Sequence, residues 1–360
     1  MKSLHVMGSK LYGGAENCYV HLTKTLAAEG HETVAVNRPG SQVAGMLSAA
    51  IRQHQVPMAN KWDLYTVVKM RRLIRTEQPQ IVQTYMGRAT RLTRVPMEVP
   101  AIHIARLGGF YKIDGYYRHA DAWIGITHKL CDYLLQSGMP SQRIFRIPNF
   151  VPPPARATAD ELVALRHRLA LPDDALLLVS LGRFVEKKGF ADLLEALARL
   201  PAEIGGRRLV LLLGGDGPQR EPLRAHCRQL GLDARVRFLG WLDRPDPYLQ
   251  LADLVVFPSR HEPMGRILQE AWNHAKPVVC TRSEGPTEIA TDDVNVLFCP
   301  IADPVALAER LLTALTTAPA DLQRLGEAGQ QTLHQHYTEA AAVASYVELY
   351  REVIAMGRVR

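Results

Sequence analysis

The stretch ADLVVFPSRHEPMGRILQEAW, residues 252–272, indicates the fold most directly. Five of its first six residues are apolar, which predicts a short buried strand that ends at Pro258. Apolar residues then recur at helical spacing from Gly265 to Ala275, and Pro277 ends the predicted helix. A buried strand that leads through a loop into a helix is the unit from which α/β folds are built.

Two carboxylates stand eight positions apart in this stretch. Glu262 lies on the loop beside the helix start, and Glu270 projects from the second helical turn. The first backbone N–H groups of a helix lack intrahelical partners and attract anions, so residues 264–267 predict a phosphate site. Because carboxylates accept hydrogen bonds from sugar hydroxyls, the stretch suits a nucleotide-sugar. The structural alternative is that Glu262 only complements the helix dipole and that Glu270 only faces solvent.

Two cations lie in a second strand-to-helix turn. Arg183 and Lys188 follow a predicted strand at 176–181 and precede a predicted helix at 190–200. Ligands of open α/β sheets bind at the carboxyl ends of the strands. At that position two cations would neutralise a diphosphate leaving group.

A glycine pair lies in the turn after the first predicted strand. Residues 9–16, which read SKLYGGAE, lead from that strand into a helix. Gly13 and Gly14 would let the backbone approach a phosphate closely. The same pair also suits a simple tight turn.

Together the three elements resemble retaining glycosyltransferases of family four, which have the GT-B fold. The Gly-Gly-Ala-Glu loop, the Gly-Arg-x4-Lys-Gly turn and the Glu-x7-Glu element occur in that family's order, and the resemblance spans about residues 1–350. Further matches are Ile147-Pro148-Asn149, Gly214-Gly215-Asp216-Gly217-Pro218, and Pro277-Val278-Val279 followed by Gly285-Pro286-Thr287-Glu288. The resemblance implies an α/β protein of GT-B architecture, with two doubly wound Rossmann-like domains that face each other across a cleft.

The domain division follows from the same resemblance and from a break in the pattern. Pro148 to Pro154 reads as a stiff linker. Residues 1–150 are expected to bind the acceptor and residues 151–338 to bind the donor. A C-terminal helix at about residues 339–357 is expected to pack back onto the first domain.

Local patterns predict alternating strands and helices, which favours parallel, doubly wound sheets. In the first half, strands are predicted at 3–7, 32–37, 80–85, 100–106, 121–126 and 143–147, with helices at 14–29, 42–54, 62–77 and 128–137. In the second half, strands are predicted at 175–181, 208–214, 235–239, 253–257, 277–280 and 296–298. Further helices are predicted at 159–170, 302–316, 319–335 and 339–356, the first with a capping box formed by Thr158 and Glu161.

The resemblance also implies roles for single residues. Glu270 would bind the nucleotide ribose, Glu262 would face the transferred sugar, and Arg183 with Lys188 would hold the diphosphate. The catalytic candidates are Glu262, Arg183 and Lys188. The expected donor contacts are Gly13, Gly14, Arg183, Lys188, Trp241, Leu242, Glu262, Met264, Gly265, Arg266 and Glu270. Of these, Trp241 and Leu242 would flank the base, although Trp241 also suits a core or interdomain position.

One position departs from the family pattern. The family often has a histidine at the end of the strand that begins near Pro100, facing the donor sugar. The corresponding position here holds Arg106, and His103 lies three residues earlier. We interpret Arg106 as a contact to a phosphate, to an acidic acceptor or to the sugar, with a structural ion pair as the alternative. The turn at residues 292–296 also lacks the glycines that are usual in the family.

Retention without a placed nucleophile implies front-face attack, in which the departing phosphate accepts the proton of the acceptor hydroxyl. No Asp-x-Asp motif occurs in the chain. Neither a metal nor another cofactor is therefore expected beside the nucleotide-sugar, and cations with the helix dipole take the metal's role. Two alternatives share the fold. A nucleotide-sugar epimerase would need acid and base groups around the sugar ring, and the Glu-x7-Glu element argues against it. Intact Glu262, Arg183 and Lys188 argue against a non-catalytic partner subunit.

Composition sets further bounds. A chain of 360 residues with 47% hydrophobic content can bury two ordinary cores. The five cysteines show no paired spacing, which favours a reducing compartment and no zinc site. We find neither a signal peptide nor a run of about 20 apolar residues. We therefore expect a cytoplasmic protein, peripheral at the inner face of the cytoplasmic membrane.

Charge is uneven along the chain. Residues 1–150 hold 19 Lys and Arg against 9 Asp and Glu, whereas the remainder has a small excess of acidic residues. No nucleic-acid module accompanies the basic half, so nucleic acid is not an expected partner. An anionic membrane or a lipid-linked glycan acceptor fits better. Residues 62–74 mix apolar and basic residues as in an interfacial helix, and the alternative is a packed helix with a solvated basic face.

Overall fold

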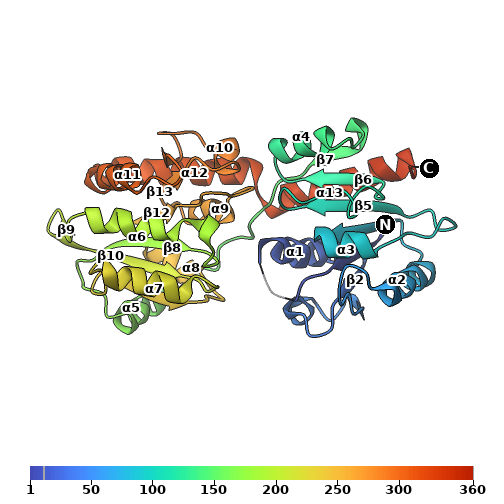
Figure 1. The fold of residues 1–360 in the computed structure, drawn as a ribbon, viewed down its shortest axis with the longest axis horizontal. Helices are drawn as coiled ribbons and strands as arrows, with labels where there is room; N and C mark the ends of the chain where they lie inside the picture. Colours follow the sequence, from blue (N-terminus) through green and yellow to red (C-terminus); the bar gives the residue numbers. More distant parts are fainter. Residues whose placement is uncertain (11–12, 360) are drawn as a thin grey trace. The chain divides into compact units, whose positions relative to one another are not determined.

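A computed structural model describes residues 1–10 and 13–359 and contains two compact units (Figure 1). The first unit combines Met1–Phe150 with the chain from Thr338 onward, and the second unit is Val151–Tyr337. Residues 147–158, which include the proline-rich segment, contain no helix or strand. Each unit is built around a largely parallel sheet covered by helices, so the predicted α/β class with two doubly wound sheets is confirmed.

The first unit has a parallel seven-stranded sheet. Its strands are β1 (Lys2–Met7), β2 (Glu32–Asn37), β3 (Arg52–Gln55), β4 (Ile81–Tyr85), β5 (Ile102–Leu107), β6 (Ala122–Gly125) and β7 (Ile144–Arg146). They lie in the order β3-β2-β1-β4-β5-β6-β7. The central strands β4 and β5 are buried along their whole length, as expected for a parallel sheet with both faces covered.

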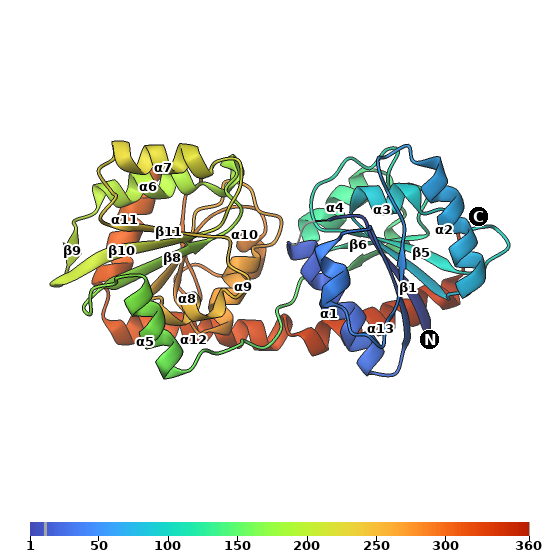
Figure 2. The same ribbon diagram turned by 90° about the horizontal axis from the view of Figure 1, so that it is seen from below.

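Helices cover both faces of this sheet. They are α1 (Gly14–Ala28), α2 (Leu64–Glu77), α3 (Met86–Leu92), α4 (His128–Gln136) and α13 (Glu339–Met356), with 3-10 turns η1 (Gln42–Met46) and η2 (Ser141–Arg143). Helices α1 and α13 lie side by side over one apolar cluster, whereas α2 and α3 cover another (Figure 2). The C-terminal helix thus packs within the first unit.

Buried tyrosines fix α13 to the sheet. The Tyr350 hydroxyl donates to Gln83 Oε1 at 2.6 Å, and Gln83 donates to the Tyr85 hydroxyl at 2.7 Å. One turn earlier, the Tyr346 hydroxyl accepts a hydrogen bond from Arg106 Nε at 2.8 Å. Because each of these contacts satisfies a buried polar group, the helix has a defined register on β4 and β5.

The second unit is built on six parallel strands in the order β11-β10-β8-β12-β13-β14. They are β8 (Leu176–Leu181), β10 (Arg207–Gly214), β11 (Val236–Gly240), β12 (Leu254–Phe257), β13 (Val278–Thr281) and β14 (Leu297–Cys299). A short strand, β9 (Glu203–Ile204), pairs antiparallel with β10. In chain order the six parallel strands follow the 3-2-1-4-5-6 arrangement of dinucleotide-binding folds.

The helices of the second unit also form two layers. They are α5 (Ala159–Arg168), α6 (Phe190–Arg199), α7 (Arg220–Gln229), α8 (Asp246–Leu251), α9 (Arg266–Asn273), α10 (Pro286–Ile289), α11 (Pro304–Thr316) and α12 (Pro319–His336), with the 3-10 turn η3 (Glu186–Lys188). Helix α6 packs on α7 and α11, while α12 packs on α9 and α5 packs on α8 (Figure 2). The predicted capping box is present, with N–H···O distances of 2.8 and 3.2 Å between Thr158 and Glu161.

The helix predicted at residues 42–54 is wrong. The segment instead contains η1 and then β3, which pairs in parallel with β2. Val43, Leu47 and Ile51 recur every four residues as in a helix, and all three are buried, but Val43 lies in η1 while Leu47 and Ile51 reach the core from irregular chain. Pairing of β3 with β2 gives the backbone groups of β2 partners that a helix would not provide.

Helix α3 was missed. It starts at Met86, directly after β4, so no turn residue separates the strand from the helix. Met86 makes the change of direction by itself, with φ of 68°. The short strand β9 was missed as well.

Glu77, the last residue of α2, is buried against three basic side chains of the first unit. Its carboxylate lies 3.0 Å from Lys2 Nζ, 2.8 Å from the Arg52 guanidinium and 2.8 Å from His54 Nε2. Burial alone would raise the pKa of Glu77, but the hydrogen bonds from Lys2 and His54 and the charges of Lys2 and Arg52 outweigh it, and the pKa is lowered. Such a carboxylate stabilises the fold above its unfolded pKa and loses that contribution as the pH falls through its folded pKa.

We predict that Glu77→Gln destabilises the first unit by about 1–3 kcal/mol at pH 7, because Lys2 and Arg52 lose their acceptor charge. In acid the difference should shrink, since the wild-type carboxyl is then neutral too. Amide hydrogen exchange of β1 and β2, corrected for intrinsic rates, measures the destabilisation at pH 7 and in acid. Glu98→Gln is the control. Glu98 and its partner Arg75 are both exposed, and exposed ion pairs contribute little to stability. An equal difference in stability between wild type and variant at pH 7 and in acid would contradict the stabilising role assigned to the Glu77 charge.

Candidate active site

The strand order of the second sheet reverses between β8 and β12. From β8 the chain proceeds to β10 and β11 on one side, and from β12 to β13 and β14 on the other. Val255 of β12 pairs with Val179 of β8, which places the loops that follow these two strands next to each other. Such a switch point at the carboxyl edge is where open α/β sheets bind ligands.

The turns after β8, β10 and β11 are joined along this edge by backbone hydrogen bonds. Gly182 N–H donates to the Gly214 carbonyl at 3.0 Å, and Gly215 N–H donates to the Gly240 carbonyl at 2.8 Å. The three turns therefore form one continuous rim.

Three predicted donor residues lie on this rim. Arg183 follows β8, its side chain is exposed, and within the described residues that side chain has neither a hydrogen bond nor an ion pair. Trp241 follows β11 and is 47% exposed, so it is not a core residue of the second unit. Leu242, the next residue, approaches Gly214 at the end of β10.

Lys188 and Glu262 form an ion pair across the switch point. Both side chains are partly buried, and Lys188 Nζ also lies 5.5 Å from the centroid of the Phe257 ring. The turn that carries Lys188 ends at Gly189, with φ of 67°. A Cβ atom there would lie 1.9 Å from the Pro258 carbonyl oxygen, so only glycine lets the two loops approach this closely.

The loop that carries Glu262 is anchored to the segment after β8. The Arg260 guanidinium binds both oxygens of Asp192, at 2.8 and 2.6 Å, and these hydrogen bonds raise the pKa of Arg260. The N–H groups of Arg260 and His261 donate to the Lys187 carbonyl at 2.9 and 3.2 Å. The segment that leads into Glu262 is therefore held against the turn that carries Lys188.

Glu284, in the loop after β13, contacts the same segment. One carboxylate oxygen lies 2.6 Å from His261 Nδ1, and the other accepts the Glu262 N–H at 3.0 Å. Burial would raise the pKa of Glu284, but hydrogen bonds from backbone N–H groups and from His261 outweigh it, and the pKa is lowered. Sequence reasoning missed this residue. The only signal was its position after a strand end beside the Gly-Pro-Thr-Glu motif.

Helix α9 begins at Arg266, one residue after the predicted start, and ends at Asn273. Arg266 Nε contacts Glu270 Oε1 at 2.6 Å, so the second predicted carboxylate is paired with a guanidinium one turn before it. Gly265 directly precedes the helix, and Met264 is buried. The structure thus brings both carboxylates and both predicted cations to one edge of the second sheet.

The glycine pair belongs to the first unit. Gly13 is the N-cap of α1, Gly14 is its first residue, and the Gly13 carbonyl accepts the Asn17 N–H at 2.9 Å. These glycines follow β1, at the place where the strand order of the first sheet reverses. Leu11 and Tyr12 of the same motif lie outside the described residues.

Arg106 lies at the end of β5 and is only 2% exposed. It donates to the Tyr346 hydroxyl and to Asn149 Oδ1, so among the described residues its hydrogen-bond partners are neutral groups rather than the carboxylate of an ion pair. These contacts join β5, α13 and the start of the proline-rich segment. Contact with the acceptor or the sugar stays a prediction, and it would require these partners to rearrange.

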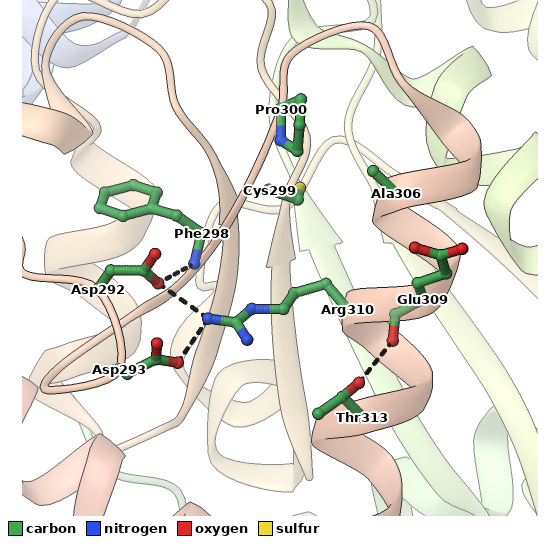
Figure 3. Close-up of a pocket in the computed structure, with 9 residues that line it drawn as sticks. All are labelled: Asp292, Asp293, Phe298, Cys299, Pro300, Ala306, Glu309, Arg310 and Thr313. Atoms are coloured by element: carbon green, nitrogen blue, oxygen red, sulfur yellow. Dashed lines mark hydrogen bonds and ion pairs between the residues drawn. The ribbon is translucent and has the colours of Figure 1, made fainter.

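A pocket of about 410 Å³ lies elsewhere, beside β14 and α11 (Figure 3). It is lined by Asp292, Asp293, Phe298, Cys299, Pro300, Ala306, Glu309, Arg310 and Thr313. Arg310 contacts Asp292 at 2.9 Å and Asp293 at 2.5 Å, and Arg282 also pairs with Asp292, so two cations balance the two carboxylates. None of the predicted donor residues lines this pocket. We assign it a structural role, because the ion pairs brace the turn in which Asp293 has φ of 57°, where the family's usual glycines are absent.

Metal-binding and disulfide chemistry have no visible basis in the described parts of the chain. Across residues 1–10 and 13–359, no group of three or more His, Cys, Asp or Glu side chains is arranged to hold a metal ion. None of the five cysteines, all of which lie in the described residues, forms a disulfide bond.

Comparison with known proteins gives a consistent result. Residues 164–332 match the model of "Glycosyl transferases group 1", and residues 12–153 match that of "Glycosyltransferase Family 4". The lipopolysaccharide core biosynthesis glycosyltransferase LpsE of Rhizobium meliloti (strain 1021) is 34% identical over 344 residues, which cover 94% of this chain and 95% of that protein. LpsD of the same organism is 32% identical over 361 residues and 99% of each chain.

A solved structure shares the fold. Anabaena Alr3699/HepE in complex with UDP and glucose matches with a TM-score of 0.84 over 98% of this chain and 100% of that chain, at 18% identity. At this identity the likeness concerns the fold alone.

Proposed function

The chain belongs to the glycosyltransferases, with a group 1 domain and a family 4 domain, and we propose that it transfers a sugar from a nucleotide-sugar to a saccharide acceptor with retention of configuration. The observation that carries the proposal is the charge cluster at the switch point of the second sheet. There Lys188 pairs with Glu262 and Arg266 pairs with Glu270, while the Arg183 side chain is exposed. The cations that would bind a diphosphate and the carboxylates that would bind sugar hydroxyls therefore lie at one edge of the second sheet.

Each charged residue has a proposed task. Arg183 and Lys188 bind the diphosphate, Glu270 binds the ribose diol, and Glu262 faces the transferred sugar. An ammonium group has three N–H donors, so Lys188 can bind a phosphate oxygen while one donor stays on Glu262. The ion pair thereby couples the leaving group to the carboxylate at the sugar.

The reaction proposed is a front-face displacement. The acceptor hydroxyl oxygen forms a bond to the anomeric carbon on the face from which the diphosphate departs, and the bond between that carbon and the phosphate oxygen breaks. The leaving oxygen takes the hydroxyl proton, so no separate base is required. Fixed cations that stabilise the growing negative charge carry most of the rate, at about 3 kcal/mol for each well-placed donor.

We propose that these cations replace a divalent metal. Arg183, Lys188 and Arg266 supply positive charge where a metal would otherwise neutralise the diphosphate. The first N–H groups of α9 add their partial positive charge.

The proposed acceptor is a lipopolysaccharide core or another lipid-linked saccharide at the cytoplasmic face of the membrane. Both Rhizobium relatives are described as lipopolysaccharide core biosynthesis glycosyltransferases. Within the described residues no helix is both long and apolar enough to span a membrane. We therefore propose that the protein reaches such an acceptor by docking peripherally on anionic lipid.

The outer face of α2 supports docking. Its inner face is buried through Met70 and Ile74, yet Leu64 and Tyr65 at its start are 77% and 66% exposed. Trp62, just before the helix, is 67% exposed. Aromatic and apolar side chains of this kind, followed along the same helix by basic residues, suit the boundary between headgroups and acyl chains.

The basic side chains beside this apolar group differ in whether another protein group already binds them. Arg71 and Arg72 are exposed on α2. Arg75 pairs with Glu98, and Lys69 Nζ donates to the Gln55 carbonyl at 2.9 Å. Trp62 is stacked by Arg91, whose guanidinium lies 4.2 Å from the ring centroid.

Arg183→Ala and Lys188→Ala should each lower turnover by about 100-fold or more, because each removes a donor to the leaving diphosphate. Release of nucleoside diphosphate from a panel of UDP-, ADP- and GDP-sugars measures this. Arg199→Ala is the control, since it removes an exposed cation from the far end of α6. Normal turnover in both variants would refute the diphosphate assignment.

Transfer should continue after incubation with EDTA, because positive charge at the diphosphate comes from side chains. The rate with EDTA is compared with rates after addition of Mg²⁺ or Mn²⁺. Loss of transfer that either ion restores would show that the proposal of metal-free chemistry is wrong.

The double variant Arg71→Glu, Arg72→Glu should release the protein from phosphatidylglycerol vesicles, since each basic residue near an anionic leaflet contributes about 1 kcal/mol. Replacement of Trp62 and Leu64 by Ser should weaken binding as well. Cosedimentation at low and high salt measures binding, and donor hydrolysis should stay unchanged.

Arg199→Glu with Arg208→Glu is the matched control, because it changes the net charge equally on the second unit. Salt-insensitive binding of the Arg71 and Arg72 variant at the wild-type level would mean that these residues only solvate a packed helix.

A further inference from the structure

We infer that Glu284 is a positioning residue for glycosyl transfer, which acts by fixing the Glu262 backbone opposite Lys188. The inference rests on the role proposed for Glu262. Glu284 lies on the loop after β13, whereas Glu262 lies on the loop after β12 and Lys188 on the turn after β8. Three consecutive positions in the sheet order thus contribute to one geometry.

The loop after β13 holds the Glu262 residue from both sides of its backbone. Its N–H donates to a Glu284 oxygen at 3.0 Å, and its carbonyl accepts the Gly285 N–H at 2.8 Å. Gly285 is required for this approach, because a Cβ atom there would lie 2.3 Å from the Met264 Cα atom. With the N–H and the carbonyl both fixed, little freedom remains for the direction of the Glu262 Cα–Cβ bond.

The contacts of Glu284 require two acceptors. One oxygen accepts the Glu262 N–H, and the other is 2.6 Å from His261 Nδ1, which precedes Glu262 directly. A carboxylate can accept both hydrogen bonds at once. A glutamine offers one acceptor and one donor, so it can keep the Glu262 contact only if His261 adopts the tautomer that accepts at Nδ1. Alanine loses both contacts.

Glu284 is inferred to affect the position of Glu262 rather than the charge beside the sugar. Glu262 and Lys188 already meet in an ion pair, and that pair is correctly aimed only if the Glu262 backbone stays where Glu284 holds it. Misplacement of a reacting or binding group by about 1 Å can lower a rate by about 100-fold. Glu284 therefore affects turnover through Glu262, without a contact of its own to the reacting atoms.

A double-mutant cycle on turnover separates this role from a general structural one. Glu284→Ala is expected to lower kcat by about 10- to 100-fold, with Glu284→Gln intermediate. In a Glu262→Gln background, Glu284→Ala should add less than about twofold, because the residue it positions has already lost its charge. Binding of UDP, ADP and GDP by calorimetry should change much less than kcat.

The control is Glu195→Ala. Glu195 on α6 also pairs with a histidine, His226 on α7, at 3.7 Å, but away from the strand ends. It should leave kcat unchanged. If Glu284→Ala does not fold, Glu284→Gln provides the same cycle, since it preserves the size of the side chain.

The outcomes distinguish the inference from the proposal beneath it. If Glu262→Gln is slow but both Glu284 variants are normal, only the inference fails. It also fails if the effects of Glu284→Ala and Glu262→Gln multiply, or if nucleotide binding falls as much as kcat. If Glu262→Gln itself keeps normal turnover, the role of Glu262 is wrong and the inference falls with it.

Discussion

The reversal of strand order between β8 and β12 is the constraint on which the rest of the second unit depends. Crossovers between parallel strands are right-handed, so a reversal sends the connecting helices to opposite faces of the sheet. At that one point no helix covers the carboxyl ends of two adjacent strands. The turn with Arg183 and Lys188 and the loop with Glu262 are the two segments that emerge there.

In the proposed function, the ion pair between Lys188 and Glu262 would reconcile two demands that conflict electrostatically. A diphosphate site favours positive charge, whereas binding of sugar hydroxyls favours a carboxylate, which would repel phosphate. Because the Lys188 ammonium group pairs with Glu262, the charge of the carboxylate is already compensated before a ligand binds. Neither side chain is fully exposed, so loss of one partner leaves a charge with incomplete hydration. The close contact of Gly189 with the Pro258 carbonyl brings the two loops near enough for this pair.

Sequence patterns predicted the local units well, because strand, turn and helix signals depend on neighbours along the chain. The strand 253–257, the turn with Lys188 and the helix after Gly265 were all anticipated within about two residues. Contacts between loops of neighbouring strands could not be predicted, because they depend on the register of the sheet. The bonds from Glu284 to His261 and to the Glu262 N–H are of this kind. Roles in ligand binding remain predictions for every residue of the cluster.

Errors in the first unit have the same physical origin. The spacing of Val43, Leu47 and Ile51 fits a helix, yet tertiary pairing of β3 with β2 decides the structure. The protein partners of Arg106 could not be predicted from the sequence either, although its predicted contact with a ligand stays a prediction. A buried arginine suggests an anion, but here neutral acceptors on α13 and Asn149 surround it.

The two faces of helix α2 differ in their surroundings. Met70 and Ile74 face the core, and their spacing of four residues makes that face apolar, as in any packed helix. A purely structural helix would then be polar on the remaining face. Leu64 and Tyr65 are instead exposed there, beside Trp62. Trp62 is stacked by Arg91, but most of the Leu64 and Tyr65 surface contacts no other part of the unit. In the proposed function this apolar group and the nearby arginines would contact an anionic membrane surface, an environment that suits both kinds of side chain.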